Sequence, residues 1–358
     1  MQLQILFLIS SIFIAFLFVP ISAKQPLFIF GDSILDAGNN NYINTSTFGQ
    51  ANFYPYGTTF FQSSTGRCSN GRLISDVIAQ HANLPLLPPY LQPGESHFYD
   101  GVNFASIGAG ALVQTNQGLV IDLHMQLRNY KNVQRLFRNK LGDFRARNRL
   151  TKAVYLFSIG GNDYSSSFIL NDSTFLSTYP QSEFIDMVLG NITFVITEIY
   201  KTGGRKFAFL NVPPVGCMPI ARISSTNGDC IKEPLLSYPK QHNIALVSIL
   251  NELKMKLPGF KYSLYDFYTN LQQRIDYPSK YGYKEGKTAC CGSGKFRGIF
   301  SCGGTRGIEE YELCENVDDY VFWDAAHPTE KVYRQLADEM WNSHSHGSYS
   351  IKDLFYLS

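Results

Sequence analysis

Three polar residues, one near the start of the chain and two near its end, are of types that act together in nucleophilic chemistry. Ser33 follows the apolar run Leu27–Phe30 after only a Gly-Asp dipeptide, so its hydroxyl is expected at the end of a buried strand. A serine hydroxyl is a weak nucleophile until a base accepts its proton. His327 can be that base, and Asp324, three residues earlier, can fix its tautomer and stabilise the imidazolium. These residue types predict attack of a serine on a carbonyl carbon.

Such a reaction also needs hydrogen-bond donors for the negative oxygen of the tetrahedral intermediate. The candidates are the backbone N–H groups of Ser33 and Gly108 and the side-chain amide of Asn162. Each follows a predicted strand, and the carboxyl ends of parallel strands meet at one edge of a sheet. Losing one such donor typically costs roughly 3–4 kcal/mol of transition-state stabilisation. We therefore expect these three groups to converge near the serine hydroxyl.

Five apolar runs predict the strands that would position these groups, and segments of helical periodicity separate them. The predicted strands are Leu27–Phe30, Tyr99–Phe104, Ala153–Ile159, Lys206–Leu210 and Tyr262–Asp266. The predicted helices are Gly71–His81, Leu119–Leu141, Phe184–Tyr200, Gln241–Leu257 and Thr329–Trp341, with Pro328 at the start of the last. Alternation of this kind indicates βαβ units and a parallel sheet. We see no internal repeat and no second domain boundary in the sequence.

The composition argues against nucleic acid as a partner. Of the 358 residues, 44% are hydrophobic and only 17% are charged, and the formal net charge is +2. This balance supplies a large core but lacks the basic surface that a nucleic-acid-binding protein needs. The sequence gives no sign of an obligate assembly, so we expect a monomer.

The first residues read as a secretory signal peptide. Leu3–Val19 is almost wholly apolar, and Pro20 and small residues ending at Ala23 follow it. This pattern predicts cleavage near Ala23, a mature domain of residues 24–358 and a secreted, extracellular or cell-wall protein without a membrane span. An uncleaved membrane anchor is the alternative, because the run is only slightly short of a spanning helix.

Secretion implies N-glycans and disulfides, and the sequence has candidates for both. Glycosylation sequons begin at Asn44, Asn171 and Asn191. The cysteines are Cys68, Cys217, Cys230, Cys290, Cys291, Cys302 and Cys314. The six in the second half predict disulfides across a long loop region, with Cys68 left free, but spacing does not give the connectivity. A zinc site is the weaker interpretation, because no Cys-x-x-Cys pair is present.

Four separated blocks resemble those of the plant GDSL esterase/lipases, a family of SGNH hydrolases. The blocks are Gly31–Asp36 with Gly38–Asn40, Asn103–Ser106, Gly160–Asp163 and Asp324–Thr329. They stand in the family's order, and the resemblance covers essentially the whole mature chain. It implies a single-domain, flavodoxin-like three-layer α/β/α sandwich with a mostly parallel five-stranded sheet. It also implies hydrolysis of carboxylic esters without a metal or cofactor.

The resemblance also assigns roles to the site residues. It implies Ser33 as nucleophile, His327 as base and Asp324 as the partner of His327, with Ser33, Gly108 and Asn162 forming the oxyanion hole. One departure from the family pattern is Ile107, which stands where members often have glycine. This leaves Gly108 as the expected donor and Gly110 as the alternative. We interpret Asp32, Asp36 and Asp163 as structural residues that hold loops.

The main hypothesis is a secreted serine hydrolase that cleaves a lipid, an acylated metabolite or an acetylated polysaccharide through an acyl-enzyme on Ser33. A second hypothesis transfers the same acyl group to an alcohol instead of water, which needs the same residues. A third is a catalytically idle cell-wall binding protein, which would predict a broken set of catalytic residues.

Overall fold

The structure is a computed structural model that describes residues 24–94, 98–169, 178–344 and 348–357. The predicted signal peptide at residues 1–23 and the sequon at Asn171 therefore lie outside the described residues. In the part of the chain that is described, no helix is both long enough and apolar enough to cross a membrane.

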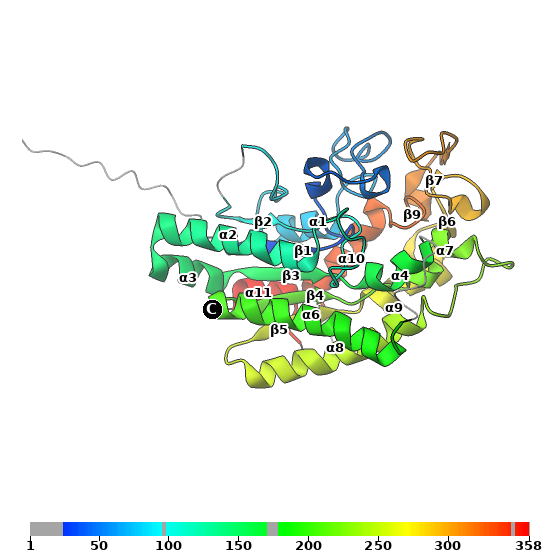
Figure 1. Ribbon diagram of the computed structural model, residues 1–358. Helices are drawn as coiled ribbons and strands as arrows, with labels where there is room; N and C mark the ends of the chain where they lie inside the picture. The colour runs from blue at the N-terminus through cyan, green and yellow to red at the C-terminus, as the bar shows by residue number, and fades with distance from the viewer. Residues whose placement is uncertain (1–23, 95–97, 170–177, 345–347, 358) are drawn as a thin grey trace, which may run out of the picture.

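A five-stranded, wholly parallel sheet forms the centre of the molecule (Figure 1). Its strands are β1 (Leu27–Gly31), β2 (Gly101–Asn103), β3 (Val154–Ser158), β4 (Lys206–Leu210) and β5 (Lys261–Tyr265), in the order β2-β1-β3-β4-β5. The strands are mostly apolar because helices cover both faces of the sheet, as a parallel sheet requires. The predicted fold class, a three-layer α/β/α sandwich, is confirmed.

Alternate residues of β1 enter two separate cores. Leu27 and Ile29 face one core, and Phe28 and Phe30 face the other, as the two-residue period of a strand dictates. Helices α1 (Ile74–His81), α9 (Phe267–Asp276), α10 (Glu330–Asn342) and α11 (Ile351–Tyr356) cover the first face. Helices α2 (Leu123–Leu141), α3 (Asp143–Lys152), α6 (Gln181–Thr202) and α8 (Ser237–Lys256) cover the second.

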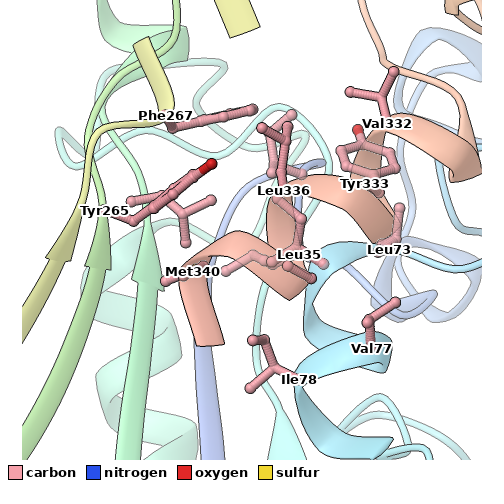
Figure 2. Packing of buried hydrophobic residues seen from close by; sticks show 14 of the residues in the cluster. Leu35, Leu73, Val77, Ile78, Tyr265, Phe267, Val332, Tyr333, Leu336 and Met340 are labelled. Carbon is pink, nitrogen blue, oxygen red and sulfur yellow. The ribbon is translucent and has the colours of Figure 1, made fainter. Parts of the chain in front are cut away.

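The two cores differ in character. In the first core, aliphatic side chains such as Leu35, Val77 and Leu336 pack together with aromatic ones such as Tyr265 and Phe267 (Figure 2). The second core is rich in stacked aromatic rings, with the Phe30 and Phe157 ring centroids 4.9 Å apart. Each fully buried side chain of this size contributes roughly 1.5–3 kcal/mol, so the sheet edge that carries Ser33 is rigidly supported.

Some element boundaries differ from the prediction for local reasons. Helix α2 begins at Leu123 rather than Leu119, because the Asp122 carboxylate caps it by accepting a hydrogen bond from Met125 N–H at 2.9 Å. Pro328 does not start the last helix, since Thr329 is the N-cap of α10 and the first helical residue is Glu330. The helices α3, α4 (Gly161–Ile169) and α9 are not among those that the periodicity predicts.

Three disulfides fasten the loops of the second half. They join Cys217 to Cys230, Cys290 to Cys314 and Cys291 to Cys302, while Cys68 is free and buried. The short strand pairs β6–β9 (Glu285–Ala289, Tyr320–Phe322) and β7–β8 (Cys291–Gly292, Glu312–Leu313) order the same region. The expected disulfides and the free Cys68 are both confirmed, and the loop region is tied to the segment that carries Asp324.

Candidate active site

The end of β1 presents Ser33 at the carboxyl edge of the sheet. Gly31 has a φ of +153°, and a Cβ there would lie 2.2 Å from the Ser158 carbonyl oxygen, so a side chain would clash with β3. The next residue, Asp32, donates its backbone N–H to the same carbonyl at 3.1 Å. The chain then turns away from the sheet, leaving Ser33 8% exposed.

The three residues singled out by type and spacing lie together. The Nε2 atom of His327 is 2.8 Å from the Ser33 Oγ, and its Nδ1 is 2.8 Å and 3.0 Å from the two carboxylate oxygens of Asp324. With Nδ1 protonated, the ring donates to Asp324 and accepts from the Ser33 hydroxyl. This arrangement can deprotonate the serine as it attacks a carbonyl carbon.

A tight turn after β9 fixes the Asp324–His327 pair. The backbone N–H groups of Ala326 and His327 donate to Asp324 Oδ1 at 2.9 Å and 2.8 Å. The Trp323 N–H also donates to the His327 carbonyl at 2.7 Å. The three-residue spacing therefore closes a turn around the carboxylate, and this turn directs the imidazole toward Ser33.

The predicted oxyanion donors are arranged around the same sheet edge. Asn162 stands in the first turn of α4, and its Nδ2 donates to the Ala109 carbonyl at 2.9 Å, leaving its second N–H available. Gly108, next to Ala109, has a φ of +81°. Within the described residues, the backbone N–H groups of Ser33 and Gly108 have no hydrogen-bond partner.

Beside Ser33 lies a mostly apolar cavity of about 60 Å³. Its polar walls include Asp32, Ser33, Asn162 and His327, and Gly108 is not among the residues that line it. The apolar side chains that line it are Ile34, Phe168, Pro213, Val215, Met218, Ile220, Ala221, Leu235 and Ala326. The reactive hydroxyl thus opens directly onto a space suited to an uncharged group.

Residues 27–340 match the sequence model of the GDSL-like lipase/acylhydrolases. The chain belongs to this family. It is 53% identical to GDSL esterase/lipase 5 of Arabidopsis thaliana over 342 residues, 92% of this chain and 87% of that one. It is also 50% identical to GDSL esterase/lipase 1 of the same plant (94% and 92% covered) and 45% identical to a GDSL lipase of Tanacetum cinerariifolium (92% and 87%). These relationships make this GDSL protein a carboxylic ester hydrolase.

Buried acids organise the loops of this GDSL protein, as predicted. Asp36 accepts hydrogen bonds from the backbone N–H groups of Gly38, Asn39 and Ile107, so it ties the loop after β1 to the turn after β2. Asp163 likewise accepts from the N–H groups of Ala111 and Leu112 and from the Thr115 hydroxyl. Burial raises the pKa of each carboxyl from 3.8 to about 6.

Asp32 combines a turn-holding role with a position in the cavity wall. Its Oδ1 accepts a hydrogen bond from Ile34 N–H at 3.0 Å, and the residue is 5% exposed. Burial raises the pKa of its carboxyl from 3.8 to about 7. This group therefore changes charge beside His327 near neutral pH.

The electrostatics of the Asp324–His327 pair favour the ionised form of both groups. Burial by itself lowers the pKa of His327, but the adjacent Asp324 carboxylate and Cys68 together outweigh burial and raise that pKa well above 6.5. Burial by itself raises the pKa of Asp324, whereas His327, the Tyr56 hydroxyl and Arg306 together bring it below 3.8. The imidazole consequently becomes a free base only at a pH above its ordinary range.

Sequence reasoning missed two residues that act on Asp324. The Tyr56 hydroxyl donates to Asp324 Oδ2 at 2.7 Å, and Arg306 donates to the Tyr56 oxygen at 3.1 Å. Tyr56 is fully buried and so packs within its loop, whereas Tyr54 is 64% exposed. No local signal in the sequence points to Arg306.

The two described sequons differ in accessibility. Asn44 is exposed in a loop. Asn191 lies inside α6, half-buried, with its amide nitrogen donating to the Met187 carbonyl and its oxygen 2.6 Å from His124 Nε2. The environment of Asn44 suits a glycan, and that of Asn191 opposes one.

Proposed function

We propose that this protein cleaves carboxylic esters through an acyl-enzyme on Ser33. The observation that carries the proposal is the 2.8 Å separation of Ser33 Oγ from His327 Nε2 at the wall of an apolar cavity. Asp324 orients the imidazole from the other side. The intact set of three residues argues against an idle binding protein.

In the first half of the reaction, Ser33 Oγ attacks the ester carbonyl carbon and its proton passes to His327 Nε2. The N–H groups of Ser33 and Gly108 and the amide of Asn162 stabilise the resulting oxyanion. When the intermediate collapses, the bond to the leaving oxygen breaks, and His327 gives the proton to the departing alcohol. Ser33 is then acylated.

In the second half, a water molecule attacks the acyl carbon and loses its proton to His327. Collapse of this intermediate breaks the bond to Ser33 Oγ, which takes the proton back from His327, and the carboxylic acid leaves. The serine and the imidazole are thereby regenerated. An alcohol in place of water would give acyl transfer by the same steps.

The cavity favours an uncharged ester with a compact apolar group. Among its described lining residues, Asp32 and His327 are the only ionisable ones, so no lysine or arginine is present there to bind a phosphate or a second carboxylate. The disulfides favour an oxidising compartment. We infer that residues 24–358 are the mature secreted enzyme, after removal of 1–23.

A fluorophosphonate probe tests the proposal directly. The purified enzyme is labelled, digested and mapped by mass spectrometry, and the adduct is expected on Ser33. Ser33→Ala should lose both labelling and ester hydrolysis, whereas Ser279→Ala, at an exposed serine, should retain both. Label on another residue, or full hydrolysis by Ser33→Ala, would refute the mechanism. Including a hydroxylated acceptor in the assay distinguishes acyl transfer from hydrolysis.

A further inference from the structure

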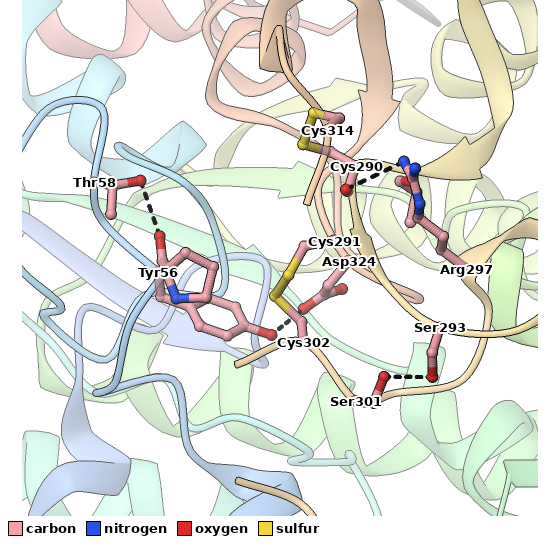
Figure 3. The surroundings of a disulfide bond; sticks show 12 residues. Tyr56, Thr58, Cys290, Cys291, Ser293, Arg297, Ser301, Cys302, Cys314 and Asp324 are labelled. Atoms are coloured by element: carbon pink, nitrogen blue, oxygen red, sulfur yellow. Dashed lines mark hydrogen bonds between the residues drawn. A yellow bond between two sulfur atoms is a disulfide. The ribbon is translucent and has the colours of Figure 1, made fainter. Parts of the chain in front are cut away.

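The Asp324 carboxylate has a second side-chain partner besides His327. Its Oδ1 accepts from two backbone N–H groups and from the imidazole, while Oδ2 accepts from the Tyr56 hydroxyl at 2.7 Å. Asp324 and Tyr56 are both fully buried. Tyr56 stands 268 residues before Asp324, in a loop of the N-terminal part of the chain, and Figure 3 shows its hydroxyl directed at the carboxylate.

Arg306 sets the direction of the Tyr56 hydrogen bond. Its Nη1 donates to the Tyr56 oxygen at 3.1 Å, and since a guanidinium only donates, the tyrosine proton is left for Asp324. Arg306 is 4% exposed, and among the described residues it forms no ion pair with a carboxylate. Its positive charge also lowers the pKa of Asp324 through space, in addition to orienting the phenol.

Backbone groups and aromatic rings hold Arg306 in place. It donates to the carbonyl oxygens of Cys302 at 3.1 Å, Thr47 at 3.1 Å and Gln50 at 2.6 Å. The guanidinium also lies over the Phe300 ring, 4.0 Å from its centroid. These contacts bridge the disulfide-rich loop and the N-terminal loop, so the side chain has a defined position.

The Cys291–Cys302 disulfide connects this arrangement to the turn that carries Asp324. Cys291 N–H donates to the Trp323 carbonyl at 2.7 Å, while Cys302 provides a carbonyl for Arg306. The Tyr56 ring packs edge-on against Trp323, with the centroids 5.9 Å apart. Figure 3 shows the disulfide beside Tyr56 and Asp324. The phenol and the carboxylate are thus fixed to one framework.

We propose that Tyr56 and Arg306 are positioning residues that hold the Asp324 carboxylate toward His327 and withdraw part of its negative charge. This inference rests on the proposed function, because it concerns the base of that mechanism. A carboxylate with less charge attracts the proton of the imidazolium less strongly, so His327 can act as a base at a lower pH. Both residues act through Asp324 and touch neither the serine nor the substrate.

The ionisable groups that face the Asp324–His327 pair together decide whether the pKa of His327 rises or falls. They are Asp32, Cys68, Tyr333, Tyr56 and Arg306. The negative charge of Asp32 favours the imidazolium, whereas the positive charge of Arg306 disfavours it. Tyr56→Phe removes one oxygen atom and leaves the other groups in place, so its effect on the imidazole can be isolated.

The test is the pH dependence of kcat/KM for a neutral ester in wild type and Tyr56→Phe. The acid limb of this profile is the pH range in which kcat/KM rises as His327 loses its proton. Loss of a hydrogen bond to the charged carboxylate is expected to move this limb to higher pH by about one unit, so that kcat/KM at a fixed pH below it falls about tenfold. The rate of phosphonate labelling at Ser33 should show the same shift. Arg306→Met should shift the limb in the same direction, and the double variant should shift it by less than the sum.

Tyr130→Phe is the matched control, because Tyr130 is also fully buried and its hydroxyl is hydrogen-bonded to Thr202 at 2.6 Å and to Tyr155 at 3.2 Å in the second core. It should lower the melting temperature without moving the acid limb. A Tyr56→Phe profile that overlays wild type, or moves to lower pH, would overturn the inference while leaving labelling at Ser33 intact. Failure of wild type to label at Ser33 would instead refute the proposed function.

Discussion

The side-chain amide of Gln126 pairs with the backbone of Gly31 as a neighbouring strand would. Gly31 N–H donates to Gln126 Oε1 at 2.8 Å, and Gln126 Nε2 donates to the Gly31 carbonyl at 2.8 Å. Strand β2 ends at Asn103, which pairs with Ile29, so it does not reach Gly31. Helix α2 thereby completes the edge of the sheet two residues before Ser33.

Replacing Gln126 with leucine should destabilise the protein and reduce activity together. The substitution leaves the buried Gly31 N–H without a partner, while the Gly31 carbonyl keeps a hydrogen bond from Ser106 N–H. One unsatisfied buried group and the lost amide bonds should cost about 2–3 kcal/mol of unfolding free energy. Urea denaturation measures this cost, with the exposed Asn139→Leu on the same helix as control. Equal stability of both variants would contradict the role assigned to Gln126.

Asp324→Asn should lower kcat/KM by about four orders of magnitude with little change in fold, as loss of the orienting carboxylate does in serine hydrolases. The two backbone N–H groups at Oδ1 would hold the amide oxygen there. The amide nitrogen would then face His327 Nδ1 and force the proton to Nε2, where it points at Ser33 and blocks deprotonation. Steady-state kinetics and circular dichroism together check this expectation. A loss below tenfold would show that Asp324 does not set the tautomer.

Activity should depend on pH through Asp32 as well as His327. Because the pKa of His327 lies well above 6.5, kcat/KM should rise with pH as the imidazole loses its proton. Asp32, whose pKa is about 7, becomes negative over a similar range and favours the imidazolium. Asp32→Asn keeps an oxygen for Ile34 N–H but removes that charge, so the acid limb should move to lower pH. A profile unchanged from wild type would remove Asp32 from the electrostatics of the site.

The sequence predicted local features better than distant contacts. The strand that precedes Ser33 and the turn from Asp324 to His327 depend on a few neighbouring residues, and both could be read from type and spacing. The hydrogen bond between Tyr56 and Asp324 depends on where two loops 268 residues apart meet, which no local pattern encodes. The sequence alone likewise gives no sign that Gln126 is more than a polar helix residue. Its hydrogen bonds to Gly31 depend on the packing of α2 against β1.

The exact ends of the helices were also harder to predict from the sequence than their presence. The apolar period begins at Leu119, but the Asp122 side chain satisfies the first turn of α2 and starts the helix at Leu123. The ten-residue helix α9 was not predicted, although Asp266 caps it in the same way. Capping chemistry decided these boundaries more than hydrophobic periodicity did.

Glycosylation should occur at Asn44 rather than at Asn191. An acceptor asparagine needs an exposed side-chain amide with no other hydrogen-bond partner. The Asn191 amide is instead hydrogen-bonded to the Met187 carbonyl and to His124 within a helix. Asn44→Gln expressed through a secretory pathway should lose one glycan on a denaturing gel, whereas Asn191→Gln should migrate as wild type. The reverse pattern would show that α6 is modified before it folds.

Met218→Ala should enlarge the cavity beside Ser33 and change the choice of ester. Met218 lines that cavity and is 8% exposed, so removing its side chain creates space that a longer apolar group can occupy. Such a substitution costs roughly 2–5 kcal/mol of stability when the space stays empty. The ratio of kcat/KM for longer over shorter p-nitrophenyl esters should rise about tenfold, since each added buried methylene contributes about 0.8 kcal/mol. Met255→Ala, at an 81% exposed position in α8, is the control and should leave the ratio unchanged. An unchanged ratio in a folded Met218→Ala enzyme would mean that the ester binds outside this cavity.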